Sequence, residues 1–120
     1  MPSTEMASYR EYMKKMIDIE KQKLNMRYEK AWEVAKQIAC LLRQKYSAKK
    51  VWVFGSLAKK EMFNPWSDID IAVEGIPHEL YYKAIAEVIS LSPEYKIDIV
   101  DIWDCSPLFR ENIQKEGILI

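Results

Sequence analysis

The stretch that decides the fold of this chain is VWVFGSLAKKEMFNPWSDIDIAV, residues 51–73. It opens with a β-branched and aromatic run, Val51–Phe54, that stops at Gly55, and this composition is typical of a buried strand. Asn64-Pro65 indicates a loop in the middle of the stretch. The alternation of acidic and apolar residues from Asp68 to Val73 then predicts a second strand. We therefore expect two strands joined by a loop.

The second strand places two carboxylates side by side. Side chains alternate between the faces of a strand, so Asp68 and Asp70 share one face while the isoleucines between and after them enter the core. Neighbouring carboxylates repel each other when both are ionised, and a hard divalent cation such as Mg²⁺ would offset that repulsion. Asp-x-Asp alone is weak support for a metal site, because acidic pairs also occur at ordinary turns.

The first strand ends in a phosphate-binding signal. Gly55 lets the backbone approach a ligand closely, and Ser56 offers a hydroxyl and an amide to phosphate oxygens. A third predicted strand, Tyr95–Trp103, adds Asp98 to the carboxylate face and leaves Asp101 on the opposite face. The combination of Gly-Ser, a loop and three carboxylates is a more specific indication of a phosphate- and metal-binding site than any one of these features alone.

The rest of the chain is predicted to be mostly helical. No Gly or Pro occurs between Pro2 and Gly55, and apolar residues recur at three- and four-residue steps over Met26–Tyr46, which predicts a helix. Residues 1–25 form an N-terminal helical extension, either a second helix or a continuation of the first. Its Met-rich face is expected to cover core, with a partner-binding surface as the alternative.

Two shorter helices and a tail follow the strands. Helices are expected over Pro77–Leu91 and from Ser106-Pro107 through Lys115, and Ile118–Ile120 is a short edge strand or a docked tail. The predicted fold class is α/β (α+β), with a small mixed sheet of three to four strands flanked by helices. The chain then divides into the extension, residues 1–25, and one domain, residues 26–120.

Composition narrows the function classes. The 120 residues include 49% hydrophobic and 30% charged residues and carry a formal net charge of zero, so they suit one folded domain without a bulk attraction to nucleic acid. No apolar run is long enough to cross a membrane, and the N-terminus lacks a secretory signal, so we expect a cytoplasmic protein. The cysteines, Cys40 and Cys105, are expected to be reduced and buried.

Aromatic residues are expected mainly in the core. Trp32, Trp52 and Trp103 are assigned there. Phe63 and Trp66, in the loop before Asp68, are expected to pack against the domain, and a flap over a bound ligand is the alternative.

These motifs resemble the minimal nucleotidyltransferase (MNT) domain family of the DNA polymerase β nucleotidyltransferase superfamily. The resemblance rests on Gly55-Ser56, the eleven residues that follow, Asp68-Ile69-Asp70, and the later Ile97-Asp98-Ile99, and it covers residues 26–120. It implies transfer of a nucleotide from a nucleoside triphosphate in a site with two metal ions. Asp68, Asp70 and Asp98 would be the catalytic and metal-binding residues, with two Mg²⁺ ions or, alternatively, Mn²⁺.

The resemblance also implies a nucleotide site and a partner. Gly55 and Ser56 would bind phosphates of ATP, assisted by Lys59 and Ser67. Many relatives have an arginine after the serine, whereas Leu57 follows here, so Lys59 or Lys60 would replace it. Family members this small occur beside a HEPN-type ribonuclease toxin, and some neutralise it by attaching AMP to a tyrosine.

Two functional hypotheses follow. The first is an antitoxin that adenylylates a tyrosine hydroxyl of a HEPN toxin, and the second is a catalytically weak or inactive binding module that neutralises its partner by complex formation. The zero net charge favours a protein acceptor over direct nucleic-acid binding. The sequence leaves homodimer formation open.

Overall fold

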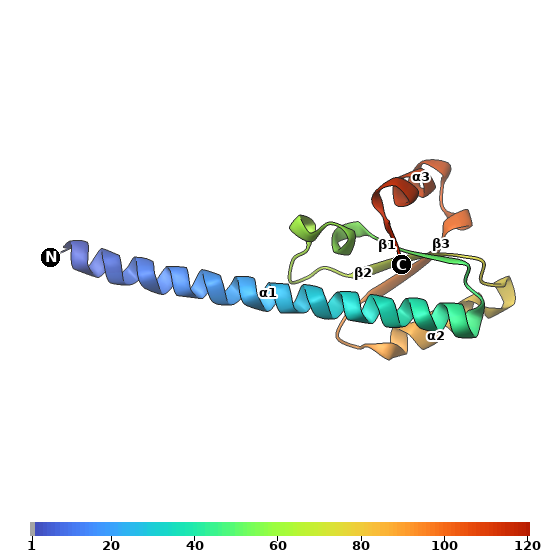
Figure 1. Cartoon of the computed structure of the whole chain (residues 1–120), viewed down its shortest axis with the longest axis horizontal. Coiled ribbons are helices and arrows are strands. Elements are labelled where there is room, and N and C mark those ends of the chain that lie inside the picture. The colour runs from blue at the N-terminus through green and yellow to red at the C-terminus, as the bar shows by residue number, and fades with distance from the viewer. Residues whose placement is uncertain (1) are drawn as a thin grey trace.

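A computed structural model describes residues 2–120, with side chains described from residue 5 onward, so Met1 of the predicted extension lies outside the described residues. The chain forms a four-stranded mixed sheet in the order β3-β2-β1-β4 with helices packed on it (Figure 1). The predicted fold class is confirmed. The strands are β1 (Lys50–Phe54), β2 (Ile69–Glu74), β3 (Ile97–Asp101) and β4 (Ile118–Leu119). The helices are α1 (Pro2–Tyr46), α2 (His78–Leu91) and α3 (Pro107–Glu116).

Strand direction brings the two predicted motifs to one end of the sheet. β1 pairs antiparallel with β2 and with β4, whereas β2 pairs parallel with β3. The end of β1 therefore lies beside the starts of β2 and β3. Two short 3₁₀ helices, η1 (Gly55–Ala58) and η2 (Lys60–Met62), follow β1 at this end.

The two faces of the sheet have separate cores. Alternate residues of β1 and β2, such as Val53 and Ile71, pack under α1 and α2 in the larger core. The intervening residues Trp52 and Ala72 pack with Ile113 of α3 in a smaller core on the other face. Asp70 and Ala72 have the same strand parity, so the predicted carboxylate face is the α3 face.

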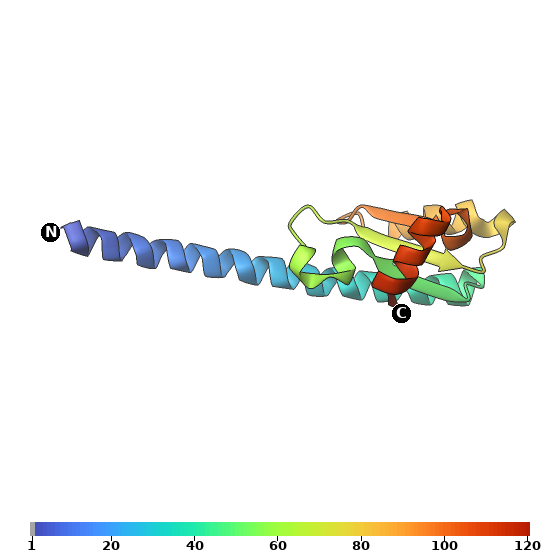
Figure 2. The ribbon, with the colours of Figure 1, turned by 90° about the horizontal axis from the view of Figure 1, so that it is seen from above.

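Helix α1 is one continuous helix of 45 residues, and its first half projects beyond the sheet (Figures 1 and 2). At 1.5 Å per residue it is about 68 Å long. A strand of six residues, such as β2, spans only about 20 Å. The expectation that the Met-rich face covers core is wrong, because the sheet ends long before the helix does and Met6, Met13 and Met16 are exposed. The predicted division between residues 25 and 26 falls inside this helix.

Two further burial predictions are wrong. Cys40 lies on the solvent side of α1 and is exposed, and Cys105 is half-buried. Trp103 is 58% exposed because β3 ends at Asp101, two residues earlier than predicted. The chain then turns through the 3₁₀ helix η3 (Ile102–Asp104), where the Asp101 carboxylate accepts a hydrogen bond from the Trp103 amide. The indole donates instead to Glu74, 2.9 Å away.

Within residues 2–120, no helix is both long and apolar enough to cross a membrane.

Candidate active site

Three strand ends place the predicted site residues together. In the sheet register, Phe54 of β1 lies opposite Asp70 of β2, and Asp70 lies opposite Asp98 of β3. Neighbouring strands lie about 4.8 Å apart, so Asp70 and Asp98 are direct neighbours across the parallel pair. Asp68 comes just before β2 begins. The structure therefore brings the Gly-Ser turn and all three carboxylates to one end of the sheet.

Gly55 lies directly against Asp70. Its φ of +70° is in the left-handed region, which glycine adopts without steric cost. A Cβ at this position would lie 2.3 Å from Asp70 Oδ2 and would clash with it. Only glycine at position 55 allows the turn after β1 to touch the carboxylate on β2.

The carboxyl group of Asp70 is electrostatically unusual. Partial burial, followed by the negative charges of Asp98 and Asp68, raises its pKa to about 6, while the nearby positive charge of Lys96 lowers it in part. Both leading causes disfavour the charged carboxylate. A positive charge placed between these side chains would offset them.

The carboxylates suit a divalent metal in their chemistry. Among residues 2–120, no three His, Cys, Asp or Glu side chains are gathered closely enough to hold a metal ion as they stand. Asp70 and Asp98 are nevertheless paired in register. Their carboxylate oxygens are ligands that suit a hard cation such as Mg²⁺, and the raised pKa of Asp70 shows that a positive charge here would be favourable. The metal-binding role of Asp68, Asp70 and Asp98 stays a prediction.

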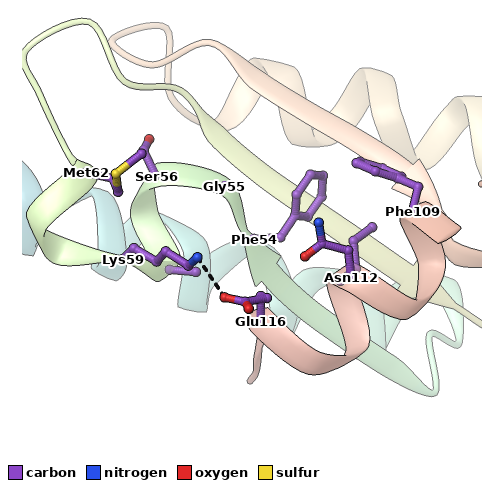
Figure 3. A pocket seen from close by; sticks show the side chains of 10 residues that line it. Phe54, Gly55, Ser56, Lys59, Met62, Phe109, Asn112 and Glu116 are labelled. Atoms are coloured by element: carbon purple, nitrogen blue, oxygen red, sulfur yellow. Dashed lines mark ion pairs between the residues drawn. The ribbon is translucent and has the colours of Figure 1, made fainter.

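A pocket of about 370 Å³ opens beside the Gly-Ser turn (Figure 3). One wall is formed by Gly55, Ser56 and Lys59 from the segment after β1. The opposite wall comes from α3, including Phe109, Asn112 and Glu116. The volume is within the range of small-molecule sites, and the pocket combines apolar walls with a few polar groups.

These residues fall within a known sequence family. Residues 36–120 match the family described as Polymerase beta, Nucleotidyltransferase, which is 71% of the chain. The chain belongs to the polymerase β nucleotidyltransferase family. No curated protein sequence matches it significantly.

Solved structures with the same fold include toxin–antitoxin complexes. A toxin–antitoxin crystal structure with AMP-PNP is similar with a TM-score of 0.58 and 22% identity, covering 71% of this chain and 70% of that one. The MntA-HepT toxin–antitoxin is similar with a TM-score of 0.53 and 21% identity, covering 73% of this chain and 69% of that one. At such identities the similarity is one of fold alone.

The two predicted phosphate ligands outside the Gly-Ser turn differ in their surroundings. Lys59 borders the pocket, but its ammonium group is 2.7 Å from a carboxylate oxygen of Glu116 (Figure 3). Ser67 is buried, and its hydroxyl accepts a hydrogen bond from the backbone N–H of Asn64 at 2.9 Å. That bond closes the loop directly before Asp68. Nucleotide binding by either residue stays a prediction.

The loop before β2 also answers a question left by the sequence. Phe63 is buried and contacts Tyr28 of α1 edge to face, as predicted. Trp66 is 84% exposed, so the expectation that it packs against the domain is wrong. The turn around Asn64, whose side chain accepts a bond from the Trp66 amide, directs this segment away from the core.

Sequence reasoning missed the α3 wall of the pocket. Phe109, Asn112 and Glu116 are more than fifty residues from the Gly-Ser turn, and their spacing matches only an ordinary amphipathic helix. Their approach to Ser56 depends on the return of the chain through β4, which pairs with β1. No local pattern could have indicated it.

Proposed function

We propose that this nucleotidyltransferase transfers AMP from ATP to a tyrosine hydroxyl of a HEPN-type toxin, in the cytoplasm and with Mg²⁺, and thereby acts as its antitoxin. The observation that carries the proposal is the contact between Gly55 and Asp70, which joins a phosphate-binding turn to a carboxylate set. Toxin–antitoxin structures with the same fold, one with an ATP analogue, support the choice of partner and nucleotide.

The two walls of the site would bind different parts of the nucleotide. The backbone amides near Gly55 and the Ser56 hydroxyl would bind the β- and γ-phosphates, and Lys59 would add a positive charge. This anchors the triphosphate at the end of β1, so that the α-phosphate lies toward the carboxylates. The pocket beyond Ser56, bordered by Phe109 and Asn112, is large enough for the remaining part of the nucleotide.

The carboxylates would then promote the transfer. The hydroxyl oxygen of the acceptor attacks the α-phosphorus, the bond from that phosphorus to the bridging oxygen breaks, and pyrophosphate leaves. Asp98 is exposed at this end of the sheet and would take the hydroxyl proton. Asp68 and Asp70, with Asp98, would hold divalent cations that stabilise the negative charge on the reacting and leaving oxygens. The products are an AMP-tyrosine ester and pyrophosphate.

A protein acceptor fits the charge of the chain. The formal net charge is zero, so no overall field concentrates a polyanion near the site. The second candidate function, a binding module with weak or no catalysis, is favoured by one observation: the carboxylates are not gathered into a ready set of three ligands.

Intact-mass spectrometry separates the two functions. The full chain is incubated with ATP, Mg²⁺ and a co-expressed HEPN-type partner, beside the Asp68→Asn/Asp70→Asn variant and a control variant at an exposed aspartate, Asp104→Asn. We expect the partner to gain one or more AMP units with the wild type and the control, but not with the double variant. A stable complex without any gain in mass would establish the binding module instead.

A further inference from the structure

The projecting part of α1 has an apolar stripe that contacts no other part of the described chain. We call residues 5–23 the arm and the exposed residues Met6, Met13 and Ile17 the arm stripe. Tyr9 and Met16 flank the stripe and are also exposed. The charged residues Glu11, Lys15 and Asp18 lie on the other side of the helix, because they are displaced from the stripe by about half a turn. Exposed Tyr12 and Ile19 lie between the charged side and the stripe, so the apolar surface of the arm is broad, and the arm is amphipathic over about 27 Å.

The arm stripe continues the face of α1 that packs on the sheet. Eleven residues make close to three helical turns, so Met13, Leu24 and Ala35 are aligned, as are Met6, Ile17 and Tyr28. Ala35 is fully buried in the larger core, and Leu24 and Tyr28 pack against it. A partner protein bound to the arm stripe would therefore lie on the same side of α1 as the sheet, next to the end of the sheet.

That end is the one that carries the candidate active site. The arm leaves the domain beside η2, where Tyr28 contacts Phe63 and the ammonium group of Lys60 lies 5.4 Å from the centroid of the Tyr28 ring. The views in Figures 1 and 2 agree that the arm projects past the turn after β1. A protein lying on the arm stripe would lie beside the end of the sheet that carries the Gly-Ser turn, with the carboxylates on the α3 face of that end.

A second pocket lies between the arm and the segment that follows β1. It has a volume of about 340 Å³, and its apolar floor is formed by Leu24, Tyr28 and Phe63. Lys21 and Lys60 border it, and neither forms an ion pair with another residue between 5 and 120. Only η2, Lys60–Met62, separates this pocket from the nucleotide pocket, which Met62 lines from the other side.

We propose that the arm stripe and this second pocket form the docking surface for the protein that accepts the nucleotide. The segment that docks is a helix with an apolar stripe, which inserts an apolar side chain between Lys21 and Lys60 and carries acidic residues opposite them. Docking there would bring the acceptor to the end of the sheet at which β3 begins with Ile97 and Asp98. The inference rests on the proposed function for the identity of the acceptor.

The charges of the arm favour a protein over other occupants. Residues 5–23 contain four acidic and five basic side chains, so the arm has no strong attraction for nucleic acid or an anionic membrane. A second copy of this chain, lying antiparallel along the arm, would place its own N-terminus at the second pocket and obstruct the edge that the acceptor must reach. We therefore assign the surface to the acceptor.

The test compares two variants with the same change in net charge. Met13→Lys/Ile17→Lys places two charges on the arm stripe, whereas Glu11→Gln/Asp18→Asn raises the net charge equally on the opposite side of the helix. Both lie outside the domain, and circular dichroism with an ATP-analogue titration checks that fold and nucleotide site are intact. Binding to the purified HEPN-type partner is measured by calorimetry, AMP transfer by intact mass, and the oligomeric state of the chain alone by light scattering.

We expect the stripe variant to bind the partner at least tenfold more weakly and to require more partner for half-maximal transfer, with kcat at saturating partner and ATP-analogue affinity unchanged. The control variant should match the wild type. Equal partner binding by the stripe variant would overturn the docking assignment. So would a wild-type dimer that becomes a monomer in the stripe variant while partner binding persists, since the surface would then join two copies. Loss of partner binding in the stripe variant without AMP transfer by the wild type would instead refute the enzymatic function and leave the docking surface standing.

Discussion

Asp70 gives the folded chain a testable dependence on pH. Its pKa is raised from the ordinary 3.8 to about 6, so the folded state binds this proton more tightly than the unfolded state does. The stabilisation from the protonated carboxyl is complete below about pH 3.8 and is lost as the pH rises through about 6. Replacing Asp70 by Asn removes that loss.

We expect Asp70→Asn to increase the free energy of unfolding by roughly 1–2 kcal/mol at pH 8 without divalent metal, a figure reduced for partial solvent screening. The gain should shrink toward pH 4. Urea unfolding of the variant and the wild type at both pH values, in EDTA, measures it, with exposed Asp18→Asn as the control. A variant less stable than the wild type at pH 8 would show that Asp70 is stabilised as a carboxylate.

The predicted role of Lys59 in nucleotide binding would make Glu116 a competitor for its ammonium group. Its carboxylate is 2.7 Å from the Lys59 ammonium, raises the pKa of Lys59, and lies in the pocket where a negatively charged ligand would bind. Freeing Lys59 should therefore help triphosphate binding. We expect Glu116→Gln to tighten binding of an ATP analogue by roughly two- to fivefold, as suits an exposed ion pair.

A matched control exists on the same helix. Glu111 pairs with Lys115 at 3.0 Å and is similarly exposed, but it does not line the nucleotide pocket. Glu111→Gln should leave the affinity unchanged in the same calorimetric titration. Unchanged or weaker binding by Glu116→Gln would show that Lys59 does not reach the phosphates.

At the scale of elements, the sequence predicts what depends on neighbours in the chain. β1 and β2 have strong β-branched composition, and the parity that places Asp70 opposite the larger core follows from alternation alone. The pairing of Asp98 with Asp70 also depends on β3 lying parallel beside β2, which the sequence pattern does not indicate. The resemblance then supplied the chemistry of these residues.

What the sequence could not predict depends on length and on distant contacts. A helix pattern does not show how far the supporting sheet extends, so it predicts core burial for the Met-rich part of α1, which is exposed. The predicted core burial of Trp103 is wrong for a similar reason, because the position of Trp103 depends on where β3 ends. The α3 wall of the nucleotide pocket depends on the β4 pairing, which two apolar residues at the end of the chain only suggest.

The two parts of α1 should respond differently to truncation of an apolar side chain. Leu42 is fully buried, so Leu42→Ala should lower the free energy of unfolding by about 2–5 kcal/mol through lost burial and a cavity. Met13→Ala, in the arm, should change it by less than about 0.5 kcal/mol. Urea unfolding of the chain alone measures both, and a large cost at Met13 would reveal that the arm is covered in solution.

The whole molecule consists of a small domain and the projecting arm, and its overall dimensions reflect this elongated shape. The principal extents are 71 × 30 × 17 Å, and the radius of gyration of the Cα atoms is 19.1 Å. A compact domain of this length would have about 14 Å. The difference arises from the arm, since α1 alone is more than twice as long as any strand it covers.

Small-angle X-ray scattering of the isolated chain tests this shape. We expect a radius of gyration near 19.1 Å at low concentration and about 13 Å for a variant that begins at residue 24, because the remaining residues form a compact unit. The shortened variant should keep its affinity for an ATP analogue, since no residue of the arm lines the nucleotide pocket. A full-length value close to 14 Å would mean that the arm folds back on the domain, and the arm stripe would then be unavailable to a partner.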